Sequence, residues 1–222
     1  KPVATAVVPI SAGRHTYKRE PSFPIAVACD PAFNFVYEAN IRYLHHLGEV
    51  TYFSPLADTS LPDAGFVYLP GGYPELYLAA LSANRQMLQS IRRYVESGGK
   101  LLAECGGMMY LCDEIRDKNG YVYPMAGVLH QSATMENMKL RLGYRTLLYN
   151  ETRLKGHEFH YSRLVEQQNP LPSCAVAYTA KGVETDTPLY HYKNVWAGYT
   201  HLYWADPVGN EWFTKFVIDG NT

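Results

Sequence analysis

Short apolar runs in the first half of the chain, each followed by a helical pattern, most constrain the fold. Four runs have the length and apolar character of strands buried on both faces, namely Ile25–Cys29, Val50–Phe53, Phe66–Leu69 and Lys100–Glu104. Strands that alternate with helices across short connections are typical of a parallel sheet with helices on both faces. The sequence therefore predicts an α/β fold with a mostly parallel sheet.

Helical spacing fills the intervals between these runs. Phe33, Tyr37, Ile41 and Leu44 recur at helical spacing, and Gly48 follows where a helix-ending glycine belongs. We expect a long helix over Leu76–Glu96 and a shorter one from Met108 to about Ile115.

The second half has a different pattern, rich in tyrosine, valine and threonine. Its strand-like segments are separated by turn residues, which suggests antiparallel hairpins added to the sheet. These segments are Leu142–Tyr149, Glu158–Val165, Ala175–Thr179 and Tyr190–Thr200, and a helix over about Asn210–Val217 follows them.

Length and composition exclude several classes of protein. The 222 residues, 47% of them hydrophobic, suffice for one self-sufficient domain, over residues 25–222, preceded by a proline-containing linker over residues 1–24. A net charge of −1 argues against a nucleic-acid partner, and no apolar run is long enough to span a membrane. Four scattered cysteines without a CxxC pair fit a reduced, cytoplasmic protein without a metal site.

The segment from Ala103 to Tyr110 carries the most specific chemical signal. A strand ends, Cys105 and two glycines follow, and a helix begins, which is the layout of a nucleophile elbow. The helix N-terminus would favour the thiolate, and the N–H group after the cysteine would face a developing oxyanion. An isolated Cys-Gly-Gly is equally consistent with a buried structural cysteine.

Two further features favour the catalytic interpretation. Gly71 and Gly72 follow the preceding strand, at the edge of a parallel sheet where ligands bind. His201 lies after a late strand and before the last helix, where the fold can bring it to a catalytic cysteine. His157 or His160 could also line a pocket, because alternate residues of their strand share one face.

Three motifs together resemble class I glutamine amidotransferase domains, in the branch found in cobyrinic acid a,c-diamide synthases. They are Gly71-Gly72-Tyr73-Pro74-Glu75-Leu76, Ala103-Glu104-Cys105-Gly106-Gly107-Met108-Met109-Tyr110 and Gly156-His157-Glu158-Phe159-His160-Tyr161-Ser162, within a resemblance covering about residues 24–215. The resemblance implies a flavodoxin-like three-layer sandwich. It also implies hydrolysis of L-glutamine to glutamate and ammonia.

The resemblance also implies roles for individual residues. Cys105 would form a γ-glutamyl thioester and His201 would transfer protons. Gly72 and Gly106 would supply the oxyanion N–H groups. The substrate would be bound by Gly71, Tyr73, His160, Tyr161 and Ser162. ATP and Mg²⁺ would bind a separate N-terminal synthetase domain, which would amidate the a and c carboxylates of cobyrinic acid.

The sequence departs from the class I pattern at one position. Tyr203 stands where a glutamate usually follows the catalytic histidine by two residues, as is also the case in the synthase branch. A backbone carbonyl, Glu158 or Asp206 could orient His201 instead. Without a fixed tautomer we expect a slow enzyme, or one assembled only when the synthetase domain is engaged.

Other functions remain open at this point. The acceptor could be another substrate, as in cobyric acid synthase, a nickel-sirohydrochlorin a,c-diamide synthase or a cell-wall amidoligase. A cysteine peptidase or related hydrolase could use the same elbow, and a non-catalytic binding module is a further alternative, although both Cys105 and His201 are present.

Overall fold

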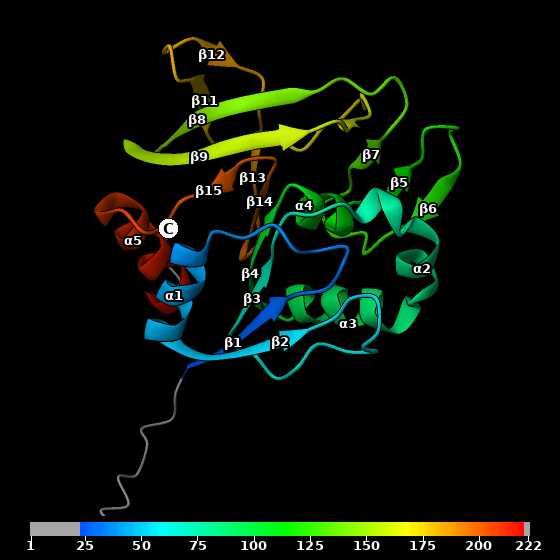
Figure 1. The fold of residues 1–222 in the computed structure, drawn as a ribbon, viewed down its shortest axis with the longest axis horizontal. Helices are drawn as coiled ribbons and strands as arrows, with labels where there is room; N and C mark the ends of the chain where they lie inside the picture. Colours follow the sequence, from blue (N-terminus) through cyan, green and yellow to red (C-terminus); the bar gives the residue numbers. More distant parts are fainter. Residues whose placement is uncertain (1–22, 220–222) are drawn as a thin grey trace, which may run out of the picture.

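The computed structural model describes residues 23–219 and is built around a six-stranded sheet with the order β13-β14-β4-β3-β1-β2 (Figure 1). The five strands from β14 to β2 run parallel, and β13 is an antiparallel edge strand. The predicted α/β class is confirmed. The bounds are β1 (Phe23–Ala28), β2 (Gly48–Phe53), β3 (Phe66–Leu69), β4 (Lys100–Glu104), β13 (Leu189–Tyr192) and β14 (Val195–Gly198).

Alternate strand residues bury opposite faces of this sheet, which makes three layers. Val67 and Leu69 of β3 pack in the core formed with α2 (Leu78–Ala83), α3 (Arg85–Glu96) and α4 (Gly106–Leu111). Phe66 and Tyr68 pack in the opposite core, with α1 (Glu38–Leu47), α5 (Pro207–Thr214) and strands of a second sheet. Both faces are therefore covered, as the continuous apolar runs predict.

The helices differ from the sequence prediction where polar side chains form hydrogen bonds with the backbone. The helix expected from Phe33 begins only at Glu38, because Asp30 accepts from the N–H groups of Ala32 and Phe33 and holds a turn there. The predicted helix over Leu76–Glu96 is divided into a 3₁₀ turn (Pro74–Leu76), α2 and α3. Asn84 ends α2 and its side chain caps α3.

Two more helix bounds differ from the prediction. α4 ends at Leu111, and Ile115 lies in β5 (Glu114–Arg116). The last helix begins earlier than predicted, at Pro207, because the Asp206 side chain accepts from the Gly209 N–H at 2.7 Å; a π-helical turn (Lys215–Asp219) follows it.

The predicted antiparallel strands of the second half are present, but most do not extend the central sheet. Most belong to a separate five-stranded sheet, with the order β12-β11-β8-β9-β15, and the predicted segment Glu158–Val165 is divided between the end of β9 and β10. β10 is part of a small four-stranded sheet, β10-β7-β5-β6, whose other three strands lie between residues 114 and 134, where the sequence pattern predicts no strand. The new bounds are β6 (Val122–Pro124), β7 (Ser132–Thr134), β8 (Arg141–Tyr149), β9 (Thr152–His160), β10 (Arg163–Leu164), β11 (Val176–Thr179), β12 (Glu184–Thr185) and β15 (His201–Leu202). The segment Tyr190–Thr200 is divided by a two-residue turn at 193–194, so that β14 returns to the parallel sheet beside β4.

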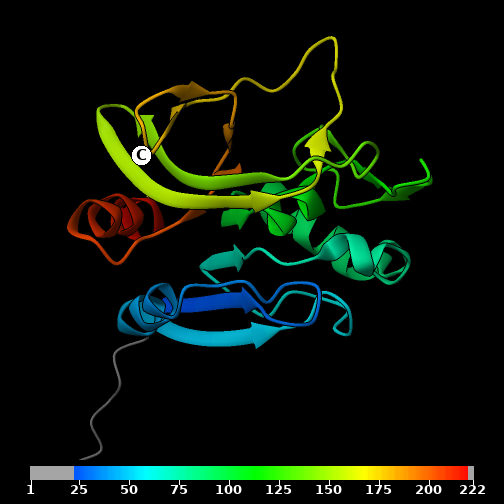
Figure 2. The ribbon, with the colours of Figure 1, turned by 45° about the horizontal axis from the view of Figure 1, so that its top comes forward.

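The β8–β9 hairpin covers the end of the central sheet at which β4 leads into α4 (Figures 1 and 2). Cys105 and the end of β9 meet there. Within residues 23–219, no helix is long and apolar enough to cross a membrane. The predicted linker over residues 1–24 falls outside the described residues except for Phe23 and Pro24.

Candidate active site

Cys105 occupies the tight turn between β4 and α4. Its backbone has φ 50° and ψ −107°, a conformation that residues other than glycine rarely adopt. Residues with such strained backbones are found most often at functional sites. The following glycines let the helix start approach the neighbouring loop, because a Cβ on Gly107 would lie 2.1 Å from the Leu69 carbonyl oxygen. The geometry is that of the elbow that the sequence predicts.

The two glycines predicted to form an oxyanion hole lie side by side. A Cβ placed on Gly106 would be 3.2 Å from the Gly72 nitrogen and 3.1 Å from its oxygen. Gly72 itself is pressed against the Ala32 carbonyl, 2.1 Å from where its own Cβ would be. The loop after β3 and the start of α4 therefore meet beside Cys105 with no room for a side chain.

A very small cavity, of about 10 Å³, lies at the cysteine. The Cys105 Sγ donates to the Phe159 carbonyl oxygen at 3.7 Å, so the end of β9 covers the sulfur. Four predicted substrate-binding residues line this cavity, whereas Gly71 and His201 do not. Its lining is Gly72, Tyr73, Glu75, Cys105, Met109, Phe159, His160, Tyr161 and Ser162.

Burial decides the charge state of the cysteine. It raises the pKa of Cys105 to about 12, helped by the negative charge of Glu75, and the hydrogen bond from the Gly106 N–H only partly offsets it. The helix start therefore stabilises the thiolate as expected, but the effect of burial is larger. Cys105 is therefore a neutral thiol in this conformation.

His201 lies against Gly71, with its ring packed on Phe35 at a centroid distance of 4.3 Å. A Cβ on Gly71 would be 2.1 Å from the ring Cε1. Burial lowers the pKa of His201 to about 3, and nearby His157 and His160 add to this effect. The imidazole is therefore neutral at physiological pH, as a proton acceptor must be.

Among residues 23–219, no acid is bonded to the His201 ring. Its Nδ1 is buried and has no hydrogen-bond partner. Of the candidates that the sequence suggests, Asp206 caps α5, and Glu158 is engaged by other residues. Tyr203, in the position of the usual glutamate, is 38% exposed.

Glu158 and His160 form a buried polar network next to the cysteine. The His160 Nε2 lies 2.7 Å from Glu158, and its Nδ1 lies 2.8 Å from the Ser162 carbonyl oxygen. Both ring nitrogens therefore face oxygen atoms, one of the Glu158 carboxyl group and one of a backbone carbonyl. Burial alone would raise the pKa of Glu158, but the hydrogen bonds from His160 and Thr187 and the charges of His160 and Arg145 hold it below its usual value.

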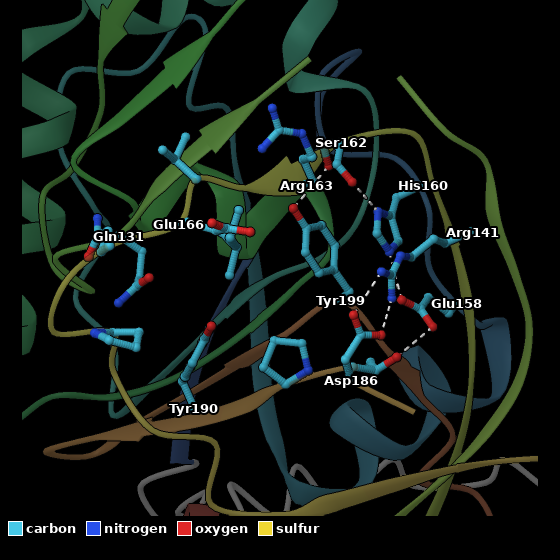
Figure 3. Close-up of a pocket in the computed structure, with 16 residues that line it drawn as sticks. Gln131, Arg141, Glu158, His160, Ser162, Arg163, Glu166, Asp186, Tyr190 and Tyr199 are labelled. Atoms are coloured by element: carbon cyan, nitrogen blue, oxygen red, sulfur yellow. Dashed lines mark hydrogen bonds and ion pairs between the residues drawn. The ribbon is translucent and has the colours of Figure 1, made fainter. Parts of the chain in front are cut away.

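Glu158 and His160 also line a larger cavity of about 610 Å³ (Figure 3). His160 and Ser162 line both cavities. The His160 ring stacks on the Tyr199 ring, with 3.7 Å between the ring centroids. The Ser162 hydroxyl lies 3.1 Å from the Tyr199 hydroxyl. Because both nitrogens of His160 are already bonded, only the face and edge of its ring remain for a ligand.

The structure thus gathers Cys105 with Gly72, Gly106 and the substrate-binding candidates Tyr73, His160, Tyr161 and Ser162. Gly71 is placed beneath His201 instead. The catalytic and binding roles of these residues stay predictions. Within residues 23–219, no group of three or more histidine, cysteine, aspartate or glutamate side chains could hold a metal ion.

Sequence reasoning missed three polar residues at this site. Glu75 lines the small cavity, while Glu104 and Asn40 are buried beside the strand of His201. Glu104 could have been noticed as a charged residue that ends an apolar strand just before the cysteine. Asn40 offers a weaker signal, as a polar residue one helical turn before Leu44.

The family model for the CobB/CobQ-like glutamine amidotransferase domain matches residues 24–208. Hydrogenobyrinate a,c-diamide synthase of Pseudomonas aeruginosa is 40% identical over 185 residues, which are 81% of this chain and 41% of that protein. Cobyrinate a,c-diamide synthase of Clostridium acetobutylicum is 39% identical over 204 residues, which are 87% of this chain and 45% of that protein.

Solved structures agree on the fold. PurLQS from Thermotoga maritima has a TM-score of 0.55 at 16% identity, covering 89% of this chain and 96% of that one. A glutamine amidotransferase from Thermotoga maritima has a TM-score of 0.53 at 12% identity, covering 89% of this chain and 83% of that one. The chain spans less than half the length of the curated relatives named above.

Proposed function

The chain belongs to the family of CobB/CobQ-like glutamine amidotransferase domains, and from that premise we propose that it hydrolyses L-glutamine at Cys105. The strained backbone of Cys105, with the glycine backbones of residues 72 and 106 beside it, carries this proposal. Acyl transfer requires N–H donors beside the nucleophile, and the closeness of these two glycine backbones to Cys105 supports that role.

The proposed reaction has two steps. The Cys105 sulfur attacks the side-chain amide carbon of glutamine while His201 takes the thiol proton, and the Gly72 and Gly106 N–H groups bind the oxyanion. His201 then passes this proton to the leaving nitrogen, so that ammonia departs and a γ-glutamyl thioester remains. Water, deprotonated by His201, cleaves the thioester and yields glutamate and the free thiol.

The ammonia is consumed elsewhere in this proposal. The curated relatives are named for a,c-diamide synthesis on cobyrinate or hydrogenobyrinate, and this chain matches less than half of their length. We therefore propose that residues 25–222 are the glutaminase domain of a cytoplasmic enzyme whose N-terminal synthetase domain is joined through residues 1–24. That domain would bind ATP, Mg²⁺ and cobyrinic acid, and would amidate the a and c carboxylates.

Two experiments test the two levels of the proposal. The glutamine-analogue electrophile 6-diazo-5-oxo-norleucine should label Cys105, as read by peptide mass spectrometry, and Cys105→Ser should abolish labelling and glutamine hydrolysis. A wild-type chain that neither labels nor releases glutamate would refute the glutaminase function.

The full-length enzyme tests the division of labour. Cys105→Ser should abolish amidation of cobyrinic acid with glutamine but not with ammonium salts. Equal loss of both activities would contradict a separate ammonia-using domain, and amidation of a different tetrapyrrole would assign another acceptor.

A further inference from the structure

The backbone on both sides of Leu202 is bonded by buried side chains from distant parts of the chain. The Asn40 amide, which is fully buried, donates to the Leu202 carbonyl at 2.7 Å and accepts from the Trp204 N–H at 2.9 Å. Asn40 therefore bonds this segment much as a neighbouring strand would, from the helix α1.

Glu104 bonds the same segment from the other side. This carboxyl group is 1% exposed and accepts from the Leu202 N–H at 3.0 Å and from the Tyr68 hydroxyl at 2.6 Å. It directly precedes Cys105, whose own N–H donates to the Gly198 carbonyl at 2.7 Å. Residues 104 and 105 are thus hydrogen-bonded to residues 202 and 198, which lie one residue after and three residues before His201.

These bonds hold the backbone beside His201 in place, and the position of that backbone helps to orient the His201 ring. β15 is an edge strand of two residues, paired on one side only with β9. The part of the chain that the structure describes bonds no acid to the His201 ring, so the orientation of the ring depends on the position of its backbone and on packing against Gly71 and Phe35. Backbone that is held by two buried, fully bonded side chains has little freedom to shift.

We propose that Asn40 and Glu104 are positioning residues that hold His201 in its catalytic place by bonding the backbone next to it, in the absence of a third triad residue. The proposal rests on the proposed role of His201 in glutamine hydrolysis. In this proposal the two buried polar side chains affect the rate of hydrolysis, in addition to forming hydrogen bonds with backbone groups.

Two pairs of variants separate this role from simple stability. Glu104→Met removes the acceptor with little change of shape, whereas Glu104→Gln keeps an oxygen for the Leu202 N–H. Asn40→Ala removes both bonds, whereas Asn40→Asp keeps the acceptor for Trp204 and loses only the donor. Asn84→Ala is the matched control, because Asn84 also donates to two carbonyls, of Pro55 and Asp58, but far from His201 along another edge of the fold.

Steady-state glutamine hydrolysis is measured for each variant at temperatures below its own unfolding transition. Glu104→Met and Asn40→Ala should lower kcat by a factor on the order of 10 to 100 with little change of KM, because a small misplacement of a catalytic group is costly. Glu104→Gln should recover most of this loss, Asn40→Asp should fall between wild type and Asn40→Ala, and Asn84→Ala should keep wild-type kcat.

Three results would overturn the proposal. These are a kcat of Glu104→Met and Asn40→Ala within twofold of the Asn84→Ala control, a loss that follows only the unfolded fraction, and a Glu104→Gln variant as slow as Glu104→Met. If neither variant of one residue folds, the pair at the other residue decides. Failure of the glutaminase function is distinguishable, because the wild-type chain would then show neither hydrolysis nor labelling of Cys105.

Discussion

A single methyl group at Gly71 should displace His201, the proposed catalytic histidine, without changing the fold. The Cβ of Gly71→Ala would lie 2.1 Å from the His201 Cε1 and 2.9 Å from its Nδ1. Ordinary contact begins at 3.4 Å, so the ring must move by about 1.3 Å. The backbone at position 71 is not left-handed, so alanine is allowed there apart from this contact.

The kinetic effect follows from this displacement. A misplacement of about 1 Å in a catalytic constellation costs on the order of 100-fold in rate. That factor corresponds to about 2.7 kcal/mol of activation free energy. We expect Gly71→Ala to lower kcat for glutamine by this factor, measured as glutamate release.

Gly99→Ala is the matched control for this substitution. Its Cβ would lie 2.4 Å from the Tyr94 ring, an overlap of similar size with an aromatic side chain that has no part in the proposed site. Gly99→Ala should therefore keep wild-type kcat, whatever it does to stability. A Gly71→Ala variant as active as Gly99→Ala would refute the placement of His201 in the reaction.

Three further predictions concern charge and burial. Burial raises the pKa of Glu104 from 4.5 to about 8, so the folded state binds the extra proton between these values. The unfolding free energy measured in urea should therefore fall as pH rises through this window, and the fall should be smaller in Glu104→Gln. Glu158→Gln leaves the largely buried Arg145 without its anionic partner and should cost on the order of 3–5 kcal/mol in the same assay. Glu96→Gln, at an exposed ion pair, should change little. Iodoacetamide at neutral pH should modify the exposed Cys29 before the buried Cys105, as read by peptide mapping, and the reverse order would contradict the covered sulfur.

The parts of the fold and site that could be predicted are those that contiguous residues encode. The apolar runs give the strands of the central sheet within a few residues, because a strand buried on both faces leaves little choice of side chain. The turn at Cys105 is likewise encoded by the two glycines that follow it, since no larger residue fits against Leu69 and Gly72.

The parts that could not be predicted depend on side chains that bond the backbone of distant segments. Asn84 divides a continuous helical pattern because its amide also bonds the 55–58 loop. Asn40 lies 162 residues from the Leu202 carbonyl that it binds, and neither residue is unusual in its own segment. The raised pKa of Cys105 could not be predicted from the residues around it in sequence, because it arises from burial under β9.

The burial of Cys105 connects substrate entry with activation of the thiol. A cavity of about 10 Å³ is too small for a glutamine side chain, so an amide that reaches the sulfur must first displace the Phe159 carbonyl. That same carbonyl and the surrounding β9 segment are what exclude water from the thiol and raise its pKa. We therefore expect that movement of residues 159–162 would both open the cavity to an amide and reduce the desolvation of the thiolate. A segment that stays closed would slow the reaction, which adds a structural reason to expect either a slow enzyme or one assembled only when the synthetase domain is engaged.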